Sequence, residues 1–273
     1  MKSLPHVRKK EILEMLKRSD YIDAGELSRK FNVSYMTIHR DLKALEEEGM
    51  VSRVYGGAVA ASGESGVSPV PPAPSADLTL EERFPICREE KMAIARAAVE
   101  LVEPGDIICM DASTSALQMC PLLHDREVTV VTNSLNVAIQ FADSRTVQVL
   151  LLGGLLRKSS MSLSRVKSPD LLEHINIGKC FFSASGLSSS KGMMELSYEE
   201  SEAKREMISR ADKLYVLADH TKLGTAAPYV DCRCQRITAV ITDWCPTMEE
   251  SQRRCLGELD RAGIRIIYGK QES

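Results

Sequence analysis

The stretch from Asp106 to Leu123 reads DIICMDASTSALQMCPLL. Its apolar run at 106–110 predicts a buried β-strand. The small hydroxyl residues that follow lead into a helical pattern over 114–123. A strand that passes through a short polar turn into a helix is half of a βαβ unit, so this stretch predicts an α/β domain with a parallel sheet.

The same alternation continues on both sides of this stretch. Further apolar runs predict strands at 128–131, 147–152, 180–184, 213–218, 237–242 and 264–268. Helical patterns fit between most of them and are clearest at Glu89–Leu101, Leu135–Ala142, Tyr198–Ala211 and Met248–Ala262. The alternation predicts a doubly wound, mainly parallel α/β domain over residues 79–270, with helices on both faces of the sheet.

Polar or glycine-rich loops follow four of the predicted strands. In a doubly wound sheet the ligand lies outside the carboxyl ends of the strands. A helix start favours phosphate, carboxylate and amide groups suit sugar hydroxyls, and lysine adds positive charge. The candidate effector-binding residues are Asp111, Ser113, Thr114, Ser115, Thr132, Asn133, Ser134, Gly153, Gly154, Asp219 and Lys222. Helix capping and turn formation explain each of them singly, but their agreement on one edge favours a phosphosugar site.

A change of composition separates this domain from the N-terminus. Residues 61–78 consist largely of Gly, Ser, Pro and Ala, and the run Pro69–Pro74 favours an extended, rather stiff chain. We expect a linker here, with a smaller domain at 1–60.

Residues 1–60 carry the pattern of a winged helix-turn-helix. Helices are predicted at 6–18 and at Ala24–Phe31, the latter with Asp23 as its N-cap. A third helix is predicted from Ser34 to about Glu48. Two short β-like runs within residues 50–59 then predict a wing.

The third predicted helix has an apolar stripe and an opposite polar face. A helix-turn-helix inserts such a helix into the major groove of double-stranded DNA. The candidate DNA-binding residues are Ser34, Tyr35, Met36, Thr37, His39, Arg40, Lys43 and Arg53. A three-helix bundle with a solvated charged face is the alternative that this pattern alone leaves open.

Composition limits the remaining possibilities. The chain has 273 residues, 44% of them hydrophobic and 27% charged, which is typical of a globular protein with two domains. Its net charge of −3 argues against indiscriminate coating of nucleic acid. No apolar run approaches the roughly 20 residues of a membrane span, and a signal-peptide pattern is absent, so we expect a cytoplasmic protein with no membrane partner.

The eight cysteines do not follow a metal-binding pattern. Cys232-x-Cys234 is the only cluster, and its spacing to Cys245 and Cys255 is irregular for zinc. We therefore expect reduced, mostly buried thiols, and we predict no cofactor and no metal site.

The N-terminal motifs resemble those of the DeoR family of bacterial repressors. The matching residues are Glu26-Leu27-Ser28, Phe31-Asn32-Val33-Ser34, Thr37-Ile38-His39-Arg40-Asp41-Leu42, Leu45-Glu46, Gly49 and Arg53-Val54-Tyr55-Gly56-Gly57-Ala58. The resemblance implies a winged helix-turn-helix that binds DNA. His39 stands where the family usually has a second arginine.

Nearly all of residues 85–270 resemble the sensor domain of the same family, which is similar in fold to phosphosugar isomerases and coenzyme A transferases. The matching points are Lys91 with Ile94-Ala95, Gly105-Asp106, Asp111–Ser115, Thr132–Ser134, Gly153-Gly154, Phe182–Gly186 and Asp219–Lys222. There are departures: Ser113 replaces a common glycine, Arg165 falls near a usual glycine, and Cys180 near a usual aspartate. The resemblance implies a phosphosugar effector, and the bulkier Ser113 is expected to narrow the phosphate pocket.

Two alternatives concern the second domain. A sugar-phosphate isomerase needs a positioned acid and base, but the loop at 185–190 contains no carboxylate. A platform for dimerisation alone would bind no effector. We therefore predict that the domain has no catalytic residues. We predict that the protein is a transcriptional repressor of a carbohydrate operon. Because helix-turn-helix proteins usually read two half-sites, we also expect at least a homodimer.

Overall fold

The structure is a computed structural model, and it describes residues 5–16, 21–31, 33, 37–38, 41–42, 44–45, 50–54, 57–60, 78–164 and 172–269. The chain divides into two compact units, residues 1–75 and residues 76–273. Each unit is described by itself.

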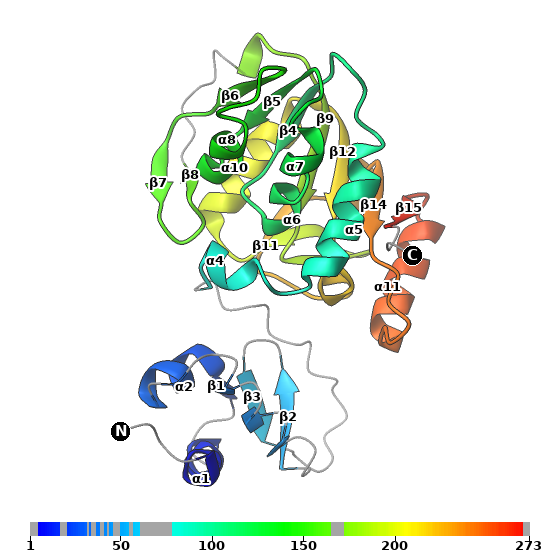
Figure 1. The fold of residues 1–273 in the computed structure, drawn as a ribbon. Coiled ribbons are helices and arrows are strands. Elements are labelled where there is room, and N and C mark those ends of the chain that lie inside the picture. The colour runs from blue at the N-terminus through cyan, green and yellow to red at the C-terminus, as the bar shows by residue number, and fades with distance from the viewer. Residues whose placement is uncertain are drawn as a thin grey trace. The chain divides into compact units, whose positions relative to one another are not determined.

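The N-terminal unit contains helices and a small antiparallel sheet (Figure 1). Its elements are α1 (Pro5–Leu16), β1 (Tyr21–Asp23), α2 (Ala24–Phe31), β2 (Val51–Val54) and β3 (Gly57–Ala60). The predicted hairpin of the wing is confirmed as β2 and β3, which pair in antiparallel register. The sequence analysis missed β1, which adds to β3, because three residues are too short to show an alternating pattern.

The core of this unit is formed by the apolar stripes that predicted its helices. Ile12 of α1 and Leu27 of α2 are buried together with Ile38, Leu42 and Leu45. The described residues of the third predicted helix, at 37–38, 41–42 and 44–45, are helical. A buried ion pair between Arg8 and Asp41 also joins α1 to this segment.

The C-terminal unit contains a seven-stranded parallel sheet, as the sequence predicts. Its strands are β4 (Ile107–Met110), β5 (Val128–Thr132), β6 (Val147–Leu151), β9 (Ile177–Ser183), β12 (Ala211–Leu217), β14 (Ala239–Thr242) and β15 (Arg265–Tyr268). Their spatial order is β15-β14-β12-β9-β4-β5-β6. The chain therefore winds outward in one direction from β4 and in the other from β9, which makes the β4/β9 boundary the topological switch point.

Helices cover both faces of this sheet (Figure 1). One face carries α5 (Arg88–Val99), α6 (Thr114–Leu117), α7 (Cys120–Leu123) and α8 (Leu135–Gln140), and the other carries α10 (Tyr198–Ser209) and α11 (Glu250–Arg261). Because successive side chains of a strand point to opposite faces, Phe181 of β9 packs in the first layer and Phe182 in the second. A short helix, α4 (Leu80–Arg83), precedes α5.

The single helix predicted over residues 114–123 is wrong. The structure divides it into α6 and α7, with Gln118 as the C-cap of the first and Met119 as the N-cap of the second. Pro121 lies at the start of α7. Proline has no N–H to donate and its ring clashes with the preceding turn, so it favours a new helix start over continuation.

Short antiparallel strands at the carboxyl edge of the sheet were not predicted. They are β7 (Leu155–Arg157) with β8 (Ser162–Ser164), and a sheet of β10 (Gly186–Ser188), β11 (Gly192–Glu195) and β13 (Tyr229–Cys232). Each has only three or four residues and, unlike the equally short β4, none of them is a wholly apolar run. Among the described residues, no helix has the length and apolar character needed to cross a membrane.

The turn between β6 and β7 contains two glycines, Gly153 and Gly154, which differ in how closely other atoms approach them. A Cβ at Gly154 would lie 2.3 Å from the Ser164 carbonyl oxygen, whereas a Cβ at Gly153 would meet nothing within 4 Å. We predict that Gly154→Ala lowers the free energy of unfolding by about 1–3 kcal/mol, because β8 has to move. Gly153→Ala should change it by less than about 0.5 kcal/mol. Urea unfolding followed by circular dichroism measures both, and equal losses would rule out the Ser164 contact as the cause.

Candidate functional site

The parallel sheet brings the predicted loops to one edge. The loops in question follow β4, β5, β6 and β12. Strands β4, β5 and β6 are neighbours in the sheet, and β12 is separated from β4 by β9, so all four loops leave the same carboxyl edge. The expectation that these segments share an edge is therefore confirmed. Their individual contacts differ from those that the sequence suggested.

The loop after β4 is closed by hydrogen bonds within itself. Asp111 Oδ1 accepts from the Ser113 amide at 3.2 Å and from the Ser113 hydroxyl at 2.5 Å. Ser113 Oγ also accepts from the Ala116 amide at 3.1 Å, which makes it the N-cap of α6. Thr114 and Ser115 are buried beside it. The capping explanation of Ser113 is thus correct, and its hydroxyl is turned back toward Asp111.

Lys204 of α10 holds the switch point together. Its ammonium lies 2.9 Å from Asp111 Oδ2 and 2.5 Å from Glu195 Oε1, and donates to the Ser183 carbonyl at 2.6 Å. Asp111 Oδ2 also accepts from the Ser183 amide at 2.9 Å. All the side chains of this ion network are buried. The network therefore joins the ends of β4, β9 and β11 to α10.

This ion network changes the acidity of its members. Burial opposes the charge of Lys204, but the carboxylates of Asp111 and Glu195 outweigh it and raise its pKa above the ordinary value. Burial likewise opposes the charge of Glu195, but Lys204 and a 2.6 Å hydrogen bond from Ser185 keep its pKa below the ordinary value. Sequence reasoning found no carboxylate in the loop at 185–190. Glu195 reaches that loop because β11 pairs with β10.

Asp231 of β13 is a further carboxylate, close to Lys204 and Glu195 of this network. Burial, assisted by the negative charge of Glu195, raises its pKa to about 7. Neither of its carboxylate oxygens has a hydrogen-bond partner among the described residues. Sequence reasoning did not identify Asp231, because β13 was not predicted.

The loop after β5 is covered by the β7–β8 hairpin. The Asn133 carbonyl accepts from the Leu163 amide at 2.7 Å, and Asn133 Nδ2 donates to the Leu163 carbonyl at 3.0 Å. Thr132 Oγ1 accepts from the Ser134 amide, while Ser134 is the N-cap of α8. In the described part of the chain, the buried Asn133 Oδ1 has no partner. The side-chain oxygens of Thr132 and Ser134, by contrast, both accept backbone hydrogen bonds.

The loop after β12 lies in a cationic environment. Asp219 is buried, and although burial opposes its charge, Lys222 and a hydrogen bond from Thr221 hold its pKa below the ordinary value. Lys91 of α5 also interacts with Asp219 and donates to the Arg83 carbonyl at 2.9 Å. Burial, together with the nearby charge of Lys222, lowers the pKa of Lys91 to about 8. Sequence analysis noted Lys91 as a family match but gave it no role.

A cavity of about 430 Å³ lies at the start of α10. It is lined by Arg157, Ser159, Leu196, Ser197, Tyr198, Glu199 and Tyr229. Arg157 donates to the Ser197 hydroxyl and lies 3.4 Å from Glu200 Oε1, while the rings of Tyr198 and Tyr229 meet edge to face at 5.6 Å. Sequence patterns did not reveal this cavity, because Arg157 and Tyr229 lie on the unpredicted strands β7 and β13 and meet the predicted helix α10 only in the folded chain.

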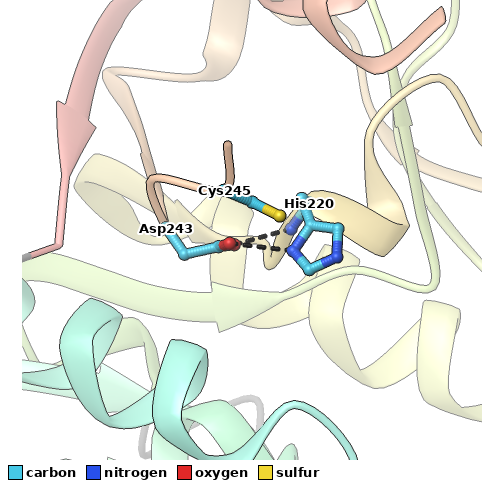
Figure 2. A group of neighbouring side chains, drawn as sticks. All are labelled: His220, Asp243 and Cys245. Atoms are coloured by element: carbon cyan, nitrogen blue, oxygen red, sulfur yellow. Dashed lines mark hydrogen bonds and ion pairs between the residues drawn. The ribbon is translucent and has the colours of Figure 1, made fainter. Parts of the chain in front are cut away.

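Three side chains of metal-ligating type meet after β12 and β14 (Figure 2). His220 Nδ1 lies 2.8 Å from Asp243 Oδ2, and Cys245 lies beside the pair. The Asp243 hydrogen bond, against the opposing effect of burial, raises the pKa of His220 to about 9. Cys234 and Cys255, which the sequence analysis considered with Cys245, instead donate their thiols to the carbonyls of Ser189 and Leu187.

The DNA-binding candidates lie mostly outside the described residues. These are Ser34, Tyr35, Met36, His39, Arg40 and Lys43, and the same holds for Arg165 of the second unit. Thr37 is partly buried in the third helical segment, and the backbone of Arg53 belongs to β2 of the wing.

Two family models match the chain. The model described as the DeoR C terminal sensor domain matches residues 86–244, and the model described as a DeoR-like helix-turn-helix domain matches residues 8–64. The two matches correspond to the two structural units.

Curated relatives match over most of the chain. The HTH-type transcriptional regulator GolR of Listeria innocua serovar 6a is 35% identical over 240 residues, covering 88% of this chain and 91% of that protein. The HTH-type transcriptional repressor GlcR of Bacillus subtilis is 31% identical, with coverage of 96% and 95%. The lactose phosphotransferase system repressor of Staphylococcus epidermidis is 29% identical, with coverage of 85% and 90%.

Similarity to solved structures is weaker. Ribose 5-phosphate isomerase A from Methanocaldococcus jannaschii has a TM-score of 0.38 and 14% identity, covering 50% of this chain and 54% of that chain. A likeness of this size carries no argument about activity.

The ion network predicts a large effect of one substitution. Lys204→Met should lower the free energy of unfolding by about 3–5 kcal/mol, because Asp111 and Glu195 would stay buried without a counter-charge. Lys213→Met, at an exposed position of β12, should change it by less than about 0.5 kcal/mol. Urea unfolding at neutral pH compares the two variants. A loss below 1 kcal/mol for Lys204→Met would contradict the role assigned to this network.

The raised pKa of Asp231 should make the stability of the folded chain depend on pH. Its pKa is about 7 in the folded chain against 3.8 ordinarily, so between these values the folded state binds more protons than the unfolded state. Stability therefore falls as pH rises through this range. Asp231→Asn cannot titrate, and its stability relative to the parent should increase from pH 4.5 to pH 7 and then level off. Asp212→Asn, at an exposed position of β12, is the control. A parent-to-variant difference that stays constant with pH would refute the raised pKa.

Proposed function

Because the chain belongs to the DeoR family of HTH-type transcriptional regulators, we propose that it represses a carbohydrate-metabolism operon and that a phosphorylated sugar modulates its affinity for operator DNA. Its relatives are transcriptional regulators and not enzymes, and the chain is a regulator of the same kind. The repressor sense and the sugar connection are supported by relatives named as a transcriptional repressor and a lactose phosphotransferase system repressor.

The DNA contacts are assigned to the third helix and the wing. In a winged helix-turn-helix the second helix of the motif enters the major groove, where Arg and polar side chains contact bases and phosphates. We assign this role to the segment from Ser34 to Lys43, with Arg40 as the leading base or phosphate contact and Arg53 on the wing. Two half-sites in the operator would require at least a homodimer, acting where the DNA is, in the cytoplasm.

The effector proposal is supported by two features of the carboxyl edge of the sheet: a pair of lysine ammonium groups and a buried hydrogen-bond acceptor. The ammonium groups of Lys91 and Lys222 both interact with the carboxylate of Asp219, and their positive charge favours an anion such as phosphate nearby. Among the described residues the buried Asn133 Oδ1 has no hydrogen-bond partner, and a sugar hydroxyl can donate to it. Together these groups favour a molecule with an anionic end and a hydroxyl-bearing end.

The geometry revises the role of two predicted contacts. Asp111 has both carboxylate oxygens occupied by donors from Ser113, Ser183 and Lys204. We therefore assign Asp111 to holding the loop in place, and Ser113 to capping α6. Lys222 and Asn133 are the leading contacts. A ligand that reaches both has to extend across β4 and β9, because their loops follow β12 and β5.

Fluorescence anisotropy with labelled DNA from upstream of the gene tests the proposal. We expect saturable binding at fixed salt that one phosphorylated sugar changes and its unphosphorylated form does not. Arg40→Ala should weaken DNA binding by about 5- to 150-fold, as loss of a good base contact costs about 1–3 kcal/mol. Lys222→Gln should leave DNA binding unchanged and raise the effector concentration for half-response about 10- to 100-fold, since a charged hydrogen bond contributes about 1.5–3 kcal/mol. Lys191→Gln, in the exposed turn before β11, is the control.

Two results would contradict the proposal. Absence of sequence-selective DNA binding would remove the regulator assignment for this gene. DNA binding that no phosphorylated sugar changes would favour a C-terminal unit that serves only in dimerisation.

A further inference from the structure

His220, Asp243 and Cys245 form a compact cluster at the carboxyl edge (Figure 2). One ligand atom from each lies within 4.8 Å of the other two. The sheet brings them together: β12 and β14 are neighbours, with Leu217 opposite Ile241, so the segments that follow the two strands emerge side by side. The cluster combines a nitrogen, an oxygen and a sulfur ligand from two separate loops.

Hydrogen bonds fix two of the three side chains. Asp243 is buried, and its Oδ1 accepts from the His220 amide at 2.7 Å while its Oδ2 faces His220 Nδ1 at 2.8 Å. The His220 side chain is 19% exposed, so the ring is held at the surface end of the pair. Cys245 is a partly buried free thiol whose sulfur lies 3.2 Å from Thr247 Oγ1. The cluster is therefore ordered, yet open on the side of Cys245.

We propose that His220, Asp243 and Cys245 bind one thiophilic divalent transition-metal ion of the Zn²⁺ type. Imidazole, carboxylate and thiolate are the ligands that zinc uses in proteins, whereas Mg²⁺ and Ca²⁺ require oxygen ligands. A tetrahedral site with bonds of about 2.0–2.3 Å places its ligands about 3.5 Å apart. The present separations of up to 4.8 Å are wider, so metal binding would have to draw the three ligand atoms together.

The three ligands would leave a fourth coordination position open. This position lies at the same sheet edge as Asp219 and Lys222, since His220 itself belongs to the 3-10 turn His220–Lys222. An ion here would fix that turn and the start of the segment after β14. Metal binding at this cluster requires no particular effector and can be measured by itself.

The alternative for His220 and Asp243 is a simple ion pair, which needs no third residue. Cys245 distinguishes the two explanations, because only a metal site uses its thiolate. Trp244 lies between two of the proposed ligands and is the only tryptophan of the chain. Its fluorescence therefore reports on events at this cluster.

Co²⁺ is the probe for the test, added to the metal-free, full-length protein in a non-thiol reductant. We expect one ion per chain, a thiolate-to-cobalt charge-transfer absorption, quenching of Trp244 fluorescence, and reversal of both signals by Zn²⁺. Cys245→Ser should abolish the charge-transfer absorption and weaken Co²⁺ binding by at least about tenfold, since even outer-shell groups contribute 10- to 100-fold. Cys232→Ser, which alters a partly buried thiol at the end of β13, should keep both signals.

Absence of the charge-transfer absorption in the parent protein would overturn the proposal. Its persistence in Cys245→Ser would do the same, because the thiolate would then come from another cysteine. Circular dichroism of both variants checks that they are folded as the parent is. Neither substitution touches Lys222 or the third helix, so failure of metal binding would leave the DNA and effector measurements unaffected.

Discussion

The C-terminal unit depends on one buried cation. Lys204 reaches from α10 to the switch point of the sheet, where it contacts Asp111 after β4, Ser183 at the end of β9 and Glu195 at the end of β11. A charge in this position is stable only if acceptors surround it. The same contacts therefore set the path of the loop at 111–115 and the position of the small β10-β11-β13 sheet. The polar loops at the carboxyl edge of the sheet are therefore positioned by the contacts of Lys204.

The sequence predicted the parts of the fold that follow from repeated patterns. All seven parallel strands and most of the helices have apolar runs long enough to show their period. The pattern did not reveal the break before Pro121 or the short strands β7, β8, β10, β11 and β13, none of which is a wholly apolar run. Met194 of β11, for example, pairs with Gly186 on one side and Val230 on the other. The pairing with Val230 is a tertiary contact and leaves no local signal.

The candidate site was predictable in its place but not in its chemistry. Parallel topology requires the loops after β4, β5, β6 and β12 to share an edge, and this could be inferred from order alone. The order of the strands does not show which polar atoms already form hydrogen bonds or ion pairs within the protein. Asp111 has the residue type of a ligand contact but is occupied by Lys204, whereas Lys91 lies on a helix that sequence reasoning did not bring to the site. The His220, Asp243 and Cys245 cluster was missed for the same reason, since its members are 23 and 25 residues apart along the chain and meet only through β12 and β14.

The energetics restrict where a switch between states can lie. Allosteric coupling between an effector and DNA typically amounts to about 1–3 kcal/mol, and it is reciprocal, so each ligand weakens or strengthens the other equally. Breaking a buried ion pair costs about 3–5 kcal/mol, which is more than such coupling can supply. The Lys204 network must therefore stay intact in both states. Movement is left to segments outside this network, such as the β7–β8 hairpin over Asn133, which lies at the carboxyl edge of the sheet.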